Sequence, residues 1–305
     1  MTGEIPLGNT GRAGFVGVAG RPNVGKSTLV NALVGSEVAI SSVRPQTTRR
    51  AIRGVYTDPE AGVQMVLVDL PGVQRPLDRL TSRMQKRVER ELADADIALL
   101  VLNAQEGVGP GDRFIASALL GAGTETPVVC AVNKADLVGR EIVPVLDEAA
   151  RLEGVDEVFP VSAMTGEGVG NLRQGLAALL PEGPFLYPED ATSDQSLELL
   201  LAELIRGEVL RLTREEVPHA VEVEVLAIEV KEDGPDLVLA EIWVETPSQR
   251  GILIGRGGKR LTEIGTAARK RIERKLNRPV YLDLQVKVRS RWRRDDSMLD
   301  RLGIE

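Results

Sequence analysis

The chain has 305 residues, 43% of them hydrophobic, and a net charge of −7. The length suggests two domains or one large one, and the hydrophobic content is sufficient for packed cores. No apolar run approaches the roughly 18 residues that a membrane-spanning helix needs, and the N-terminus lacks a basic-then-apolar signal pattern. These features exclude an integral membrane protein built on such helices and predict a soluble cytoplasmic one.

Single copies of cysteine and histidine restrict the kinds of site that the chain can hold. Cys130 lies in the apolar run P-V-V-C-A-V, which predicts a small buried core residue in a reduced compartment. His219 is the only histidine, so the chain can form neither a Ser-His-Asp triad nor a cluster of histidine metal ligands.

The charge is distributed unevenly along the chain. Residues 250–294 hold fifteen Lys or Arg and three acids, a net charge of +12, whereas the other residues hold 23 basic and 42 acidic ones, a net charge of −19. A basic block on an otherwise acidic chain points to a nucleic-acid partner for that block. Charge alone leaves a solvated basic face as the alternative.

A phosphate-binding loop is predicted near the start of the chain. Residues 15–19 are apolar or small and predict a strand, residues 20–27 fit G-x-x-x-x-G-K-[ST], and residues 28–33 have helical spacing. The helix would present its positive end to phosphates, and the alternative is a chance glycine loop. The predicted nucleotide contacts here are Gly20, Arg21, Pro22, Asn23, Val24, Gly25, Lys26, Ser27 and Thr28.

Several of these residues have individual expected roles. Gly20 and Gly25 let backbone N–H groups turn toward phosphate oxygens. Lys26 supplies a point charge for the β- and γ-phosphates, and the Ser27 hydroxyl can ligate Mg²⁺.

The next two segments predict the rest of a magnesium site. The polar stretch 34–50 contains V-R-P-Q-T-T-R-R, in which Thr48 is favoured over Thr47 as a switch threonine for Mg²⁺, with a capping or turn threonine as the alternative. Residues 63–68 predict a strand that ends in D-L-P-G, where Asp69 would hold the Mg²⁺ hydration shell and the Gly72 N–H would sense the γ-phosphate. The expected metal set is Ser27, Thr48 and Asp69, and Leu70 and Pro71 complete the nucleotide contacts.

A guanine-reading element comes after further strands and helices. Helices are expected at 80–92, 112–120 and 171–180, and strands at 97–102, 128–132 and about 158–161. The strand at 128–132 leads into N-K-A-D, in which the Asp136 carboxylate can accept two hydrogen bonds from guanine. Asn133 would tie this loop to the phosphate loop, Lys134 would lie along the base, and Ser162 and Ala163 would bring a backbone N–H to guanine O6.

The alternation of strands and helices predicts an α/β fold with a mostly parallel sheet covered on both faces. All four motifs fall at the C-terminal ends of strands, where open α/β sheets bind ligands. Together they predict a P-loop guanine-nucleotide hydrolase. Val73 stands after D-x-x-G, where many small GTPases have a glutamine that orients the attacking water. Because valine cannot hydrogen-bond a water molecule, we expect another group to assist hydrolysis. Asn23 could help to coordinate a K⁺ ion, and Lys26, Asn23, Thr48 and Gly72 are the expected catalytic residues.

The last third of the chain predicts a second domain. The proline-containing stretch 181–196 predicts a linker, followed by a helix at 197–212, a hairpin of strands at 221–230 and 237–244, a helix at 261–276, a strand at 279–288 and a final helix at 296–302. With G-R-G-G at 255–258 between central helices, this order fits a KH module, whose G-x-x-G loop clamps about four nucleotides. Alone, G-x-x-G could be a helix–helix turn. The expected RNA contacts are Ile254, Gly255, Arg256, Gly257, Gly258, Lys259 and Arg260.

The combined motifs resemble the bacterial Era GTPases over essentially residues 14–302. G-R-P-N-V-G-K-S-T-L-x-N-x-L, Q-T-T-R, D-x-P-G, N-K-x-D, V-S-A, P-E-D and I-x-I-G-x-x-G stand in that family's order. The resemblance implies a Ras-like GTPase domain at 1–180, a linker at 181–196 and a type II KH domain at 197–305. Leu70 stands where the family commonly has threonine and Gln195 where arginine is common, but neither removes a predicted metal or base contact.

The resemblance also implies a function. The protein would bind GTP and GDP, hydrolyse GTP slowly with an apolar residue in place of the catalytic glutamine, and bind the 3′ tail of small-subunit ribosomal RNA while assisting biogenesis of the 30S subunit. It is compatible with peripheral contact at the inner face of the cell membrane, and we expect a monomer. An RNA-binding scaffold with a purely structural nucleotide site is the alternative, which GTP turnover would distinguish. The N-K-x-D motif opposes an ATP-driven RNA enzyme.

Overall fold

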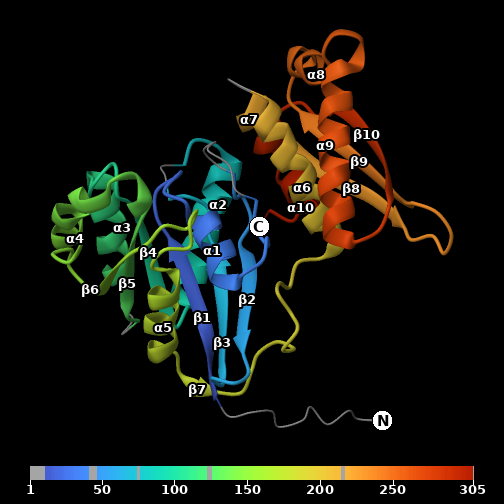
Figure 1. The fold of residues 1–305 in the computed structure, drawn as a ribbon. Coiled ribbons are helices and arrows are strands. Elements are labelled where there is room, and N and C mark those ends of the chain that lie inside the picture. The colour runs from blue at the N-terminus through green and yellow to red at the C-terminus, as the bar shows by residue number, and fades with distance from the viewer. Residues whose placement is uncertain (1–10, 41–46, 74–75, 122–125, 214–216, 305) are drawn as a thin grey trace. The chain divides into compact units, whose positions relative to one another are not determined.

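The computed structural model describes residues 11–40, 47–73, 76–121, 126–213 and 217–304. They form two compact units, shown in Figure 1. The N-terminal unit comprises the described residues of Met1–Ala39, Thr48–Arg75 and Met84–Asp194, and the C-terminal unit comprises those of Ile40–Thr47, Pro76–Arg83 and Gln195–Glu305. Two short segments from the first half of the chain therefore belong to the C-terminal unit.

The N-terminal unit is built on one sheet with the strand order β2-β3-β1-β4-β5-β6. The neighbours β3, β1, β4, β5 and β6 run parallel, whereas β2 is antiparallel to β3 and the two-residue β7 is antiparallel to β1. The predicted mostly parallel sheet is thus confirmed. The strands are β1 Gly11–Ala19, β2 Ile52–Asp58, β3 Val63–Asp69, β4 Ile97–Asn103, β5 Val128–Asn133, β6 Val155–Pro160 and β7 Glu182–Gly183.

Helices cover both faces of this sheet because the central strands are apolar on both sides. One core joins α1 and α5 to one face, and the other face carries α2, α3 and α4. All seven residues of β4 are buried, as expected of a central parallel strand. The helices are α1 Lys26–Val34, α2 Arg79–Ala93, α3 Pro110–Gly121, α4 Val143–Ala149 and α5 Val169–Leu179.

Several elements of the structure were not among those predicted. The strand β2 contains Gly54, a residue that weakens strands, but a Cβ at this position would lie only 2.7 Å from Val34 on α1. The glycine therefore permits close packing of α1 on β2. The short elements α4, α7 (Val217–Ala220) and β7 were also not predicted, whereas α8 (Pro247–Ile254) is the helix that the expected α-β-β-α-α-β order places before the glycine loop.

Most residues of the predicted linker, 181–196, belong to the N-terminal unit. The backbone N–H groups of Leu186 and Tyr187 donate to the Gln64 side chain at 2.6 and 2.9 Å, and the Ser193 hydroxyl donates to the Arg53 carbonyl at 2.8 Å. The unit boundary lies between Asp194 and Gln195, near the end of that stretch.

The C-terminal unit has a three-stranded sheet with the order β10-β9-β8. The strands β8 (Glu222–Glu229) and β9 (Asp236–Val244) form the predicted antiparallel hairpin, and β10 (Val280–Val288) runs parallel to β9. The helices α6 (Leu197–Leu212) and α9 (Lys259–Leu276) bury their apolar stripes against this sheet. Two shorter helices, α7 (Val217–Ala220) and α10 (Asp296–Arg301), complete the unit. The α-β-β-α-α-β order confirms the predicted α+β KH-type fold.

Side chains of the C-terminal unit hold both of its early segments. Arg83 donates to Asp300 and Asp296 at 2.6 and 2.9 Å, and Asp78 lies 3.6 Å from Arg293. Ile40 lies in the hydrophobic core of this unit and is 3% exposed. The predicted N-terminal stretch 1–10 and the middle of the switch segment, 41–46, lie outside the described residues.

Candidate nucleotide and RNA sites

The phosphate loop joins β1 to α1 as the motif predicts, and its backbone follows the left-handed conformations that glycine favours. Gly20 and Gly25 have φ values of 153° and 98°, and Asn23 has a φ of 67°. A Cβ at Gly25 would lie 2.3 Å from the Asn133 side chain, so only glycine fits there. The loop leads directly into the N-terminus of α1, where backbone N–H groups and the helix dipole favour an anion.

Lys26 lies beneath this loop and is 7% exposed. Its Nζ atom donates to the carbonyls of Gly20 and Arg21, both at 3.1 Å. Burial lowers the pKa of Lys26 to about 8, although the negative charge of Asp69 partly opposes this shift. A phosphate at the loop would supply the missing negative charge and favour the protonated amine.

This depressed pKa predicts that GDP binding takes up protons. A pKa of 8 leaves about half of Lys26 unprotonated at pH 8 but only about a tenth at pH 7, and phosphate contact restores the charge. We therefore expect an uptake of about half a proton at pH 8 and about a tenth at pH 7, measured by calorimetry in buffers of different ionisation enthalpy. The control variant Lys86→Met removes an exposed lysine and should preserve the difference in proton uptake between pH 8 and pH 7. Equal proton uptake at both pH values would contradict the assignment.

Three oxygen atoms from separate elements meet beside the loop. Ser27 Oγ lies 2.7 Å from Asp69 Oδ2, and Thr48 Oγ1 lies 3.0 Å from each of them. Asp69, at the end of β3, is fully buried, and Thr48 is 7% exposed. One carboxylate and two hydroxyls beside a phosphate site are hard oxygen donors of the kind that Mg²⁺ takes together with nucleotide phosphates. The described residues contain no cluster of three or more His, Cys, Asp or Glu side chains that could hold a metal without ligands from a nucleotide.

The segment after Asp69 passes close over the phosphate loop. A Cβ at Gly72 would lie 2.9 Å from Pro22, so a side chain there would collide with the loop. The next residue, Val73, donates its backbone N–H to the Gly20 carbonyl at 3.3 Å. Leu70 and Pro71, between Asp69 and Gly72, are buried.

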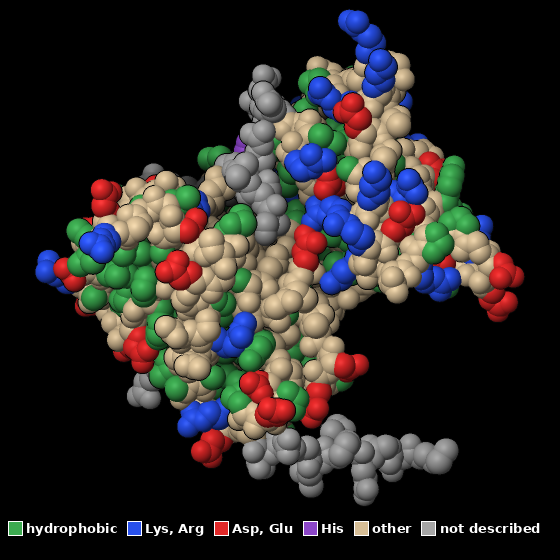
Figure 2. Space-filling model, in the orientation of Figure 1, with side chains coloured by type: hydrophobic (Ala, Val, Ile, Leu, Met, Phe, Trp, Pro, Cys, Tyr) green, Lys and Arg blue, Asp and Glu red, His purple; other side chains and the backbone are tan. Residues whose placement is uncertain are grey.

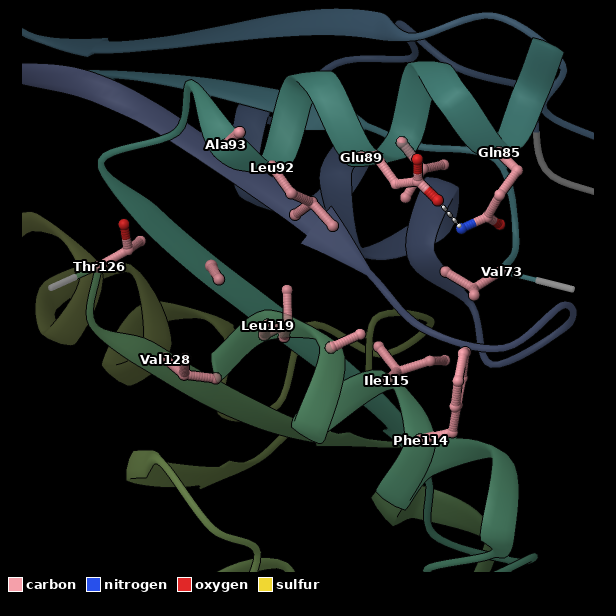
Figure 3. Close-up of a pocket in the computed structure, with 13 residues that line it drawn as sticks. Val73, Gln85, Glu89, Leu92, Ala93, Phe114, Ile115, Leu119, Thr126 and Val128 are labelled. Carbon is pink, nitrogen blue, oxygen red and sulfur yellow. Dashed lines mark hydrogen bonds between the residues drawn. The ribbon is translucent and has the colours of Figure 1, made fainter. Parts of the chain in front are cut away.

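The Val73 side chain faces an apolar cavity of about 400 Å³ between α2 and α3. Figure 3 shows Val73 at one end of this cavity, with Leu92 of α2 on one side and Phe114, Ile115 and Leu119 of α3 on the other. The cavity has a polar edge, where Gln85 donates to Glu89 at 3.1 Å. An aliphatic side chain in these surroundings has no atom that could orient a water molecule.

The base-reading loop is joined to the phosphate loop by side chains. Asn133, at the end of β5, is 2% exposed, donates to the Val24 carbonyl at 2.9 Å and accepts from the Ala163 N–H at 3.0 Å. Lys134 donates to the Asn23 carbonyl at 2.9 Å. One asparagine thus connects three of the sequence motifs, and its amide is oriented by partners on both sides.

Asp136 is exposed in the short 3₁₀ turn Ala135–Leu137 that comes after β5. The backbone N–H of Ala135 donates to the Val161 carbonyl at 3.0 Å, which ties this turn to the end of β6. Ser162 is fully buried, and its hydroxyl accepts from the Thr165 N–H at 3.1 Å. The Asp136 carboxylate is therefore accessible to a ligand beside the Ser162–Ala163 backbone.

Arg21 connects the phosphate loop to α3, a contact that was not predicted. Its guanidinium lies 2.8 Å from the fully buried Asp112 and 3.0 Å from Glu106. The hydrogen bond to Asp112 is the main reason that the pKa of Arg21 is raised. Arg21 is thus held by carboxylates of the protein. Cys130 is fully buried, and burial raises its thiol pKa to about 12, which makes it an unreactive core residue.

The C-terminal unit carries the glycine loop between α8 and α9. Gly255, Gly257 and Gly258 have φ values of 70°, 61° and 79°, which a residue with a Cβ adopts at a cost. A Cβ at Gly255 would also lie 2.8 Å from Arg260. Arg256, Lys259 and Arg260 are exposed around this loop, whereas Ile254 packs against the core. Figure 2 shows Lys and Arg side chains gathered over this unit.

An open groove of about 760 Å³ continues from the glycine loop between α9 and β10. On the α9 side, Gly265 leaves open space, because a Cβ there would meet nothing within 4 Å. Thr262 and Thr266 line the same side of the groove. Tyr281 and Leu282 line the β10 side. Sequence reasoning missed this groove. A glycine inside a helix, flanked by two threonines at helical spacing, was the available signal.

Two family models match the chain. The model described as "50S ribosome-binding GTPase" matches residues 15–134, and the KH domain model matches residues 216–293. GTPase Era from Mycobacterium tuberculosis (strain H37Rv) and GTPase Era from Mycobacterium bovis are each 46% identical to this chain, over 95% of it and 98% of their own length. The chain belongs to the Era family of GTPases.

Solved Era structures share the whole fold. A crystal structure of a variant of Aquifex aeolicus Era bound to GDP and AlF4⁻ superposes with a TM-score of 0.92, at 36% identity, and covers 96% of this chain and 99% of that one. A structure of Era in complex with MgGDPNP and nucleotides 1506–1542 of 16S ribosomal RNA matches equally well. The predicted family and the predicted two-part fold are thereby confirmed.

Proposed function

We propose that this Era-family chain is a GTP-hydrolysing switch protein that binds the 3′ end of small-subunit ribosomal RNA and assists assembly of the 30S subunit. One observation carries the proposal. A single chain combines a phosphate loop, an oxygen cluster and a base-reading loop with a basic glycine loop and groove. A relative with the same fold, matched over 96% of this chain, was solved with both MgGDPNP and a fragment of 16S ribosomal RNA.

We propose distinct tasks for the site residues. The loop Gly20–Thr28 would surround the phosphates, and Ser27, Thr48 and Asp69 would contribute to the Mg²⁺ site. When bound, Mg²⁺ would neutralise charge on the β- and γ-phosphates. Lys26 would hold the same phosphates as a point charge, the Gly72 N–H would detect the γ-phosphate, and Asp136 would read guanine beside Ser162 and Ala163.

The glycine loop and its groove would bind single-stranded RNA. Left-handed glycines let phosphates approach the main chain, and Arg256, Lys259 and Arg260 would add positive charge at the same place. The groove between α9 and β10, of about 760 Å³, continues from this loop and would take the bases. Among the described residues, no helix has the length and apolarity to cross a bilayer, and peripheral membrane contact and a monomeric state remain predictions.

The proposal is tested by measuring both activities on the purified chain. We expect slow multiple-turnover GTP hydrolysis and salt-sensitive binding of a single-stranded oligonucleotide with the sequence of the 3′ end of the organism's own 16S ribosomal RNA. RNA binding without GTP turnover would favour a scaffold with a structural nucleotide site. GTP turnover without RNA binding would remove the proposed role in ribosome assembly.

We also propose that a monovalent cation assists hydrolysis, because Val73 faces the apolar cavity and has no group to orient water. The Asn23 side chain is exposed at the tip of the phosphate loop, with its backbone carbonyl anchored by Lys134. Replacing K⁺ by tetramethylammonium at equal ionic strength should slow GTP turnover several-fold. Asn23→Gly, which tolerates the φ of 67°, should lose most of this K⁺ response. Equal rates in both salts would refute the cation role.

A further inference from the structure

The phosphate loop is anchored by a side chain to which the proposed function gives no task. Arg21 donates through Nε to Asp112 at 2.8 Å, and its Nη1 atom lies 3.0 Å from Glu106. Asp112 belongs to the first turn of α3 and is fully buried, whereas the Arg21 side chain is 27% exposed. All three residues belong to the N-terminal unit, as does the whole phosphate loop.

The connection between β4 and α3 orients both carboxylates for this contact. The Gly109 N–H donates to the second oxygen of Asp112 at 2.9 Å. The Asn103 amide, buried at the end of β4, donates to Glu106 at 2.6 Å. A Cβ at Gly111 would lie 2.7 Å from the Cδ atom of the arginine, so a glycine is needed where the arginine stem lies against α3.

This ion pair indicates that a defined geometry is needed. A buried ion pair contributes little net stability compared with apolar residues of similar volume, and its best-attested use is to specify one arrangement. An arginine suits that use, because its planar guanidinium presents donors in a fixed fork that can span two carboxylates. Arg21 is therefore held in one orientation on α3.

Two backbone carbonyls are positioned by this anchor. The carbonyls of Gly20 and Arg21 belong to the two planar peptide groups that meet at the Arg21 Cα atom. Lys26 Nζ donates to both of them at 3.1 Å, and the Val73 N–H donates to the Gly20 carbonyl at 3.3 Å. Holding Arg21 therefore holds the acceptors that orient the lysine of the loop and the residue after Gly72.

The D-x-x-G segment also contacts the residue on the other side of Arg21. A Cβ at Gly72 would lie 2.9 Å from both the Cγ and the backbone N atom of Pro22. The segment thus lies against the loop at Gly20 and at Pro22, the two neighbours of Arg21 in the chain. A shift of the loop at Arg21 would move both contacts together.

We infer that Arg21 is a positioning residue for GTP hydrolysis: its attachment to α3 sets the phosphate-loop backbone against which Lys26 and Gly72 are placed. The inference rests on the proposed GTPase function. Lys26 would contact the β- and γ-phosphates and Gly72 the γ-phosphate alone, so loosening the loop should affect GTP more than GDP. The Arg21 side chain acts through these backbone groups, because its guanidinium is held by carboxylates of the protein.

Variants of the full-length chain allow a matched comparison. Arg21→Met removes the guanidinium, and Arg21→Met with Asp112→Asn also removes the buried charge while it keeps an acceptor for the Gly109 N–H. Arg21→Lys keeps the positive charge but cannot span two carboxylates, so it should restore part of the function. The control is Arg113→Met, because Arg113 is the next residue of α3 and pairs with Glu148 at 2.5 Å, but is 52% exposed.

Three readouts separate positioning from stability: kcat for GTP, the affinity for a fluorescent non-hydrolysable GTP analogue, and the affinity for fluorescent GDP. We expect both Arg21→Met variants to lose about tenfold in kcat and in analogue affinity, with GDP affinity within about threefold of wild type. Arg21→Lys should lie between Arg21→Met and wild type. Arg113→Met should match wild type in all three.

Asp112→Asn alone distinguishes positioning from direct contact with the phosphates. This change weakens the anchor but leaves the guanidinium in place, so kcat should fall several-fold. A higher kcat would show that the released Arg21 acts on the phosphates itself, and would overturn the inference.

Other results would also contradict a positioning role. Unchanged kcat and analogue affinity in a folded Arg21→Met variant would do so, as would an equal loss of GDP and analogue affinity, which would show general damage to the loop. An equal loss of kcat in Arg113→Met would attribute the effect to the stability of α3. If the wild-type chain shows no GTP turnover, the proposed enzyme function fails, but the ratio of analogue affinity to GDP affinity still tests the role of Arg21.

Discussion

Asp136→Asn should convert the nucleotide site from guanine to xanthine. The carboxylate is exposed in the turn after β5, and the Ala135 N–H ties this turn to the Val161 carbonyl at the end of β6. It can accept from both the N1–H and the exocyclic amine of guanine, and each hydrogen bond to a charged group contributes about 1.5–3 kcal/mol. Asparagine keeps one neutral acceptor for N1–H but turns its own N–H donors toward the guanine amine. The loss of the charge and of one hydrogen bond, with two donors left facing each other, should weaken GTP binding by about 100-fold.

The same substitution should strengthen binding of xanthosine triphosphate. Xanthine presents a carbonyl where guanine has its amine, and an asparagine amide can donate to that carbonyl while its oxygen still accepts from N1–H. Fluorescence titration with both nucleotides measures the exchange. Asp147→Asn, at an exposed carboxylate on α4, is the matched control and should bind GTP as wild type does. Unchanged preference in Asp136→Asn would mean that another group reads the base.

The sequence predicts the nucleotide unit well because its functional groups lie at strand ends. Each motif there combines an apolar run, which specifies a buried strand, with the glycine or acidic residue of the turn after that strand. The turns after β1, β3 and β5 were predicted for this reason. Asn133 connects the turns after β1, β5 and β6, because its two amide partners lie 109 and 30 residues away in the chain.

The sequence did not predict β2, because its glycine is required for close packing although glycine has a low propensity for strands. The glycine in β2 argues against a strand by composition, yet it allows α1 to approach. The helix α8 has a recognisable signal, since Thr246 and Gln249 form a capping box around Pro247 and Ser248. The expected α-β-β-α-α-β order requires this helix before the glycine loop, but its bounds were not predicted because it has only eight residues.

The contacts of Ile40 and Thr47 with the C-terminal unit could not be predicted from local sequence. The Arg206 guanidinium on α6 donates to the Thr47 carbonyl, which lies 159 residues away in the chain. Neither residue lies in a recognisable motif for this hydrogen bond. An arginine in the apolar stripe of α6 suggests a surface residue until the carboxylates of Glu203 and Glu222 are placed beside it. The Arg206–Glu203 pair is local, since the two residues are three apart on α6, but the pairing of Arg206 with Glu222 and with the Thr47 carbonyl is determined by the tertiary fold.

Changing Arg256 and Gly257 both to Asp should abolish most RNA binding while leaving GTP turnover intact. Both positions are exposed in the loop before α9, and a Cβ at Gly257 would meet nothing within 4 Å. Aspartate tolerates the φ of 61° better than most residues, so the loop can accept it. The two carboxylates would stand where the RNA phosphates must pass, and the change removes one positive charge and adds two negative ones.

We expect RNA affinity at low salt to fall by at least about 100-fold, because phosphate contacts dominate such binding. The difference in affinity between wild type and variant should become smaller as the salt concentration rises. The matched control is Arg256→Asn with Gly257→Asn, which makes the same backbone changes without negative charge and should lose far less. Fluorescence anisotropy measures RNA affinity and phosphate release measures GTP turnover. The nucleotide site consists of residues before Pro181, so intrinsic turnover should stay within twofold of wild type. Wild-type RNA affinity in a folded Asp–Asp variant would show that the glycine loop is not the RNA clamp. An equal loss in the Asn–Asn control would assign the effect to backbone strain or to the loss of the Arg256 cation, and not to the added negative charge.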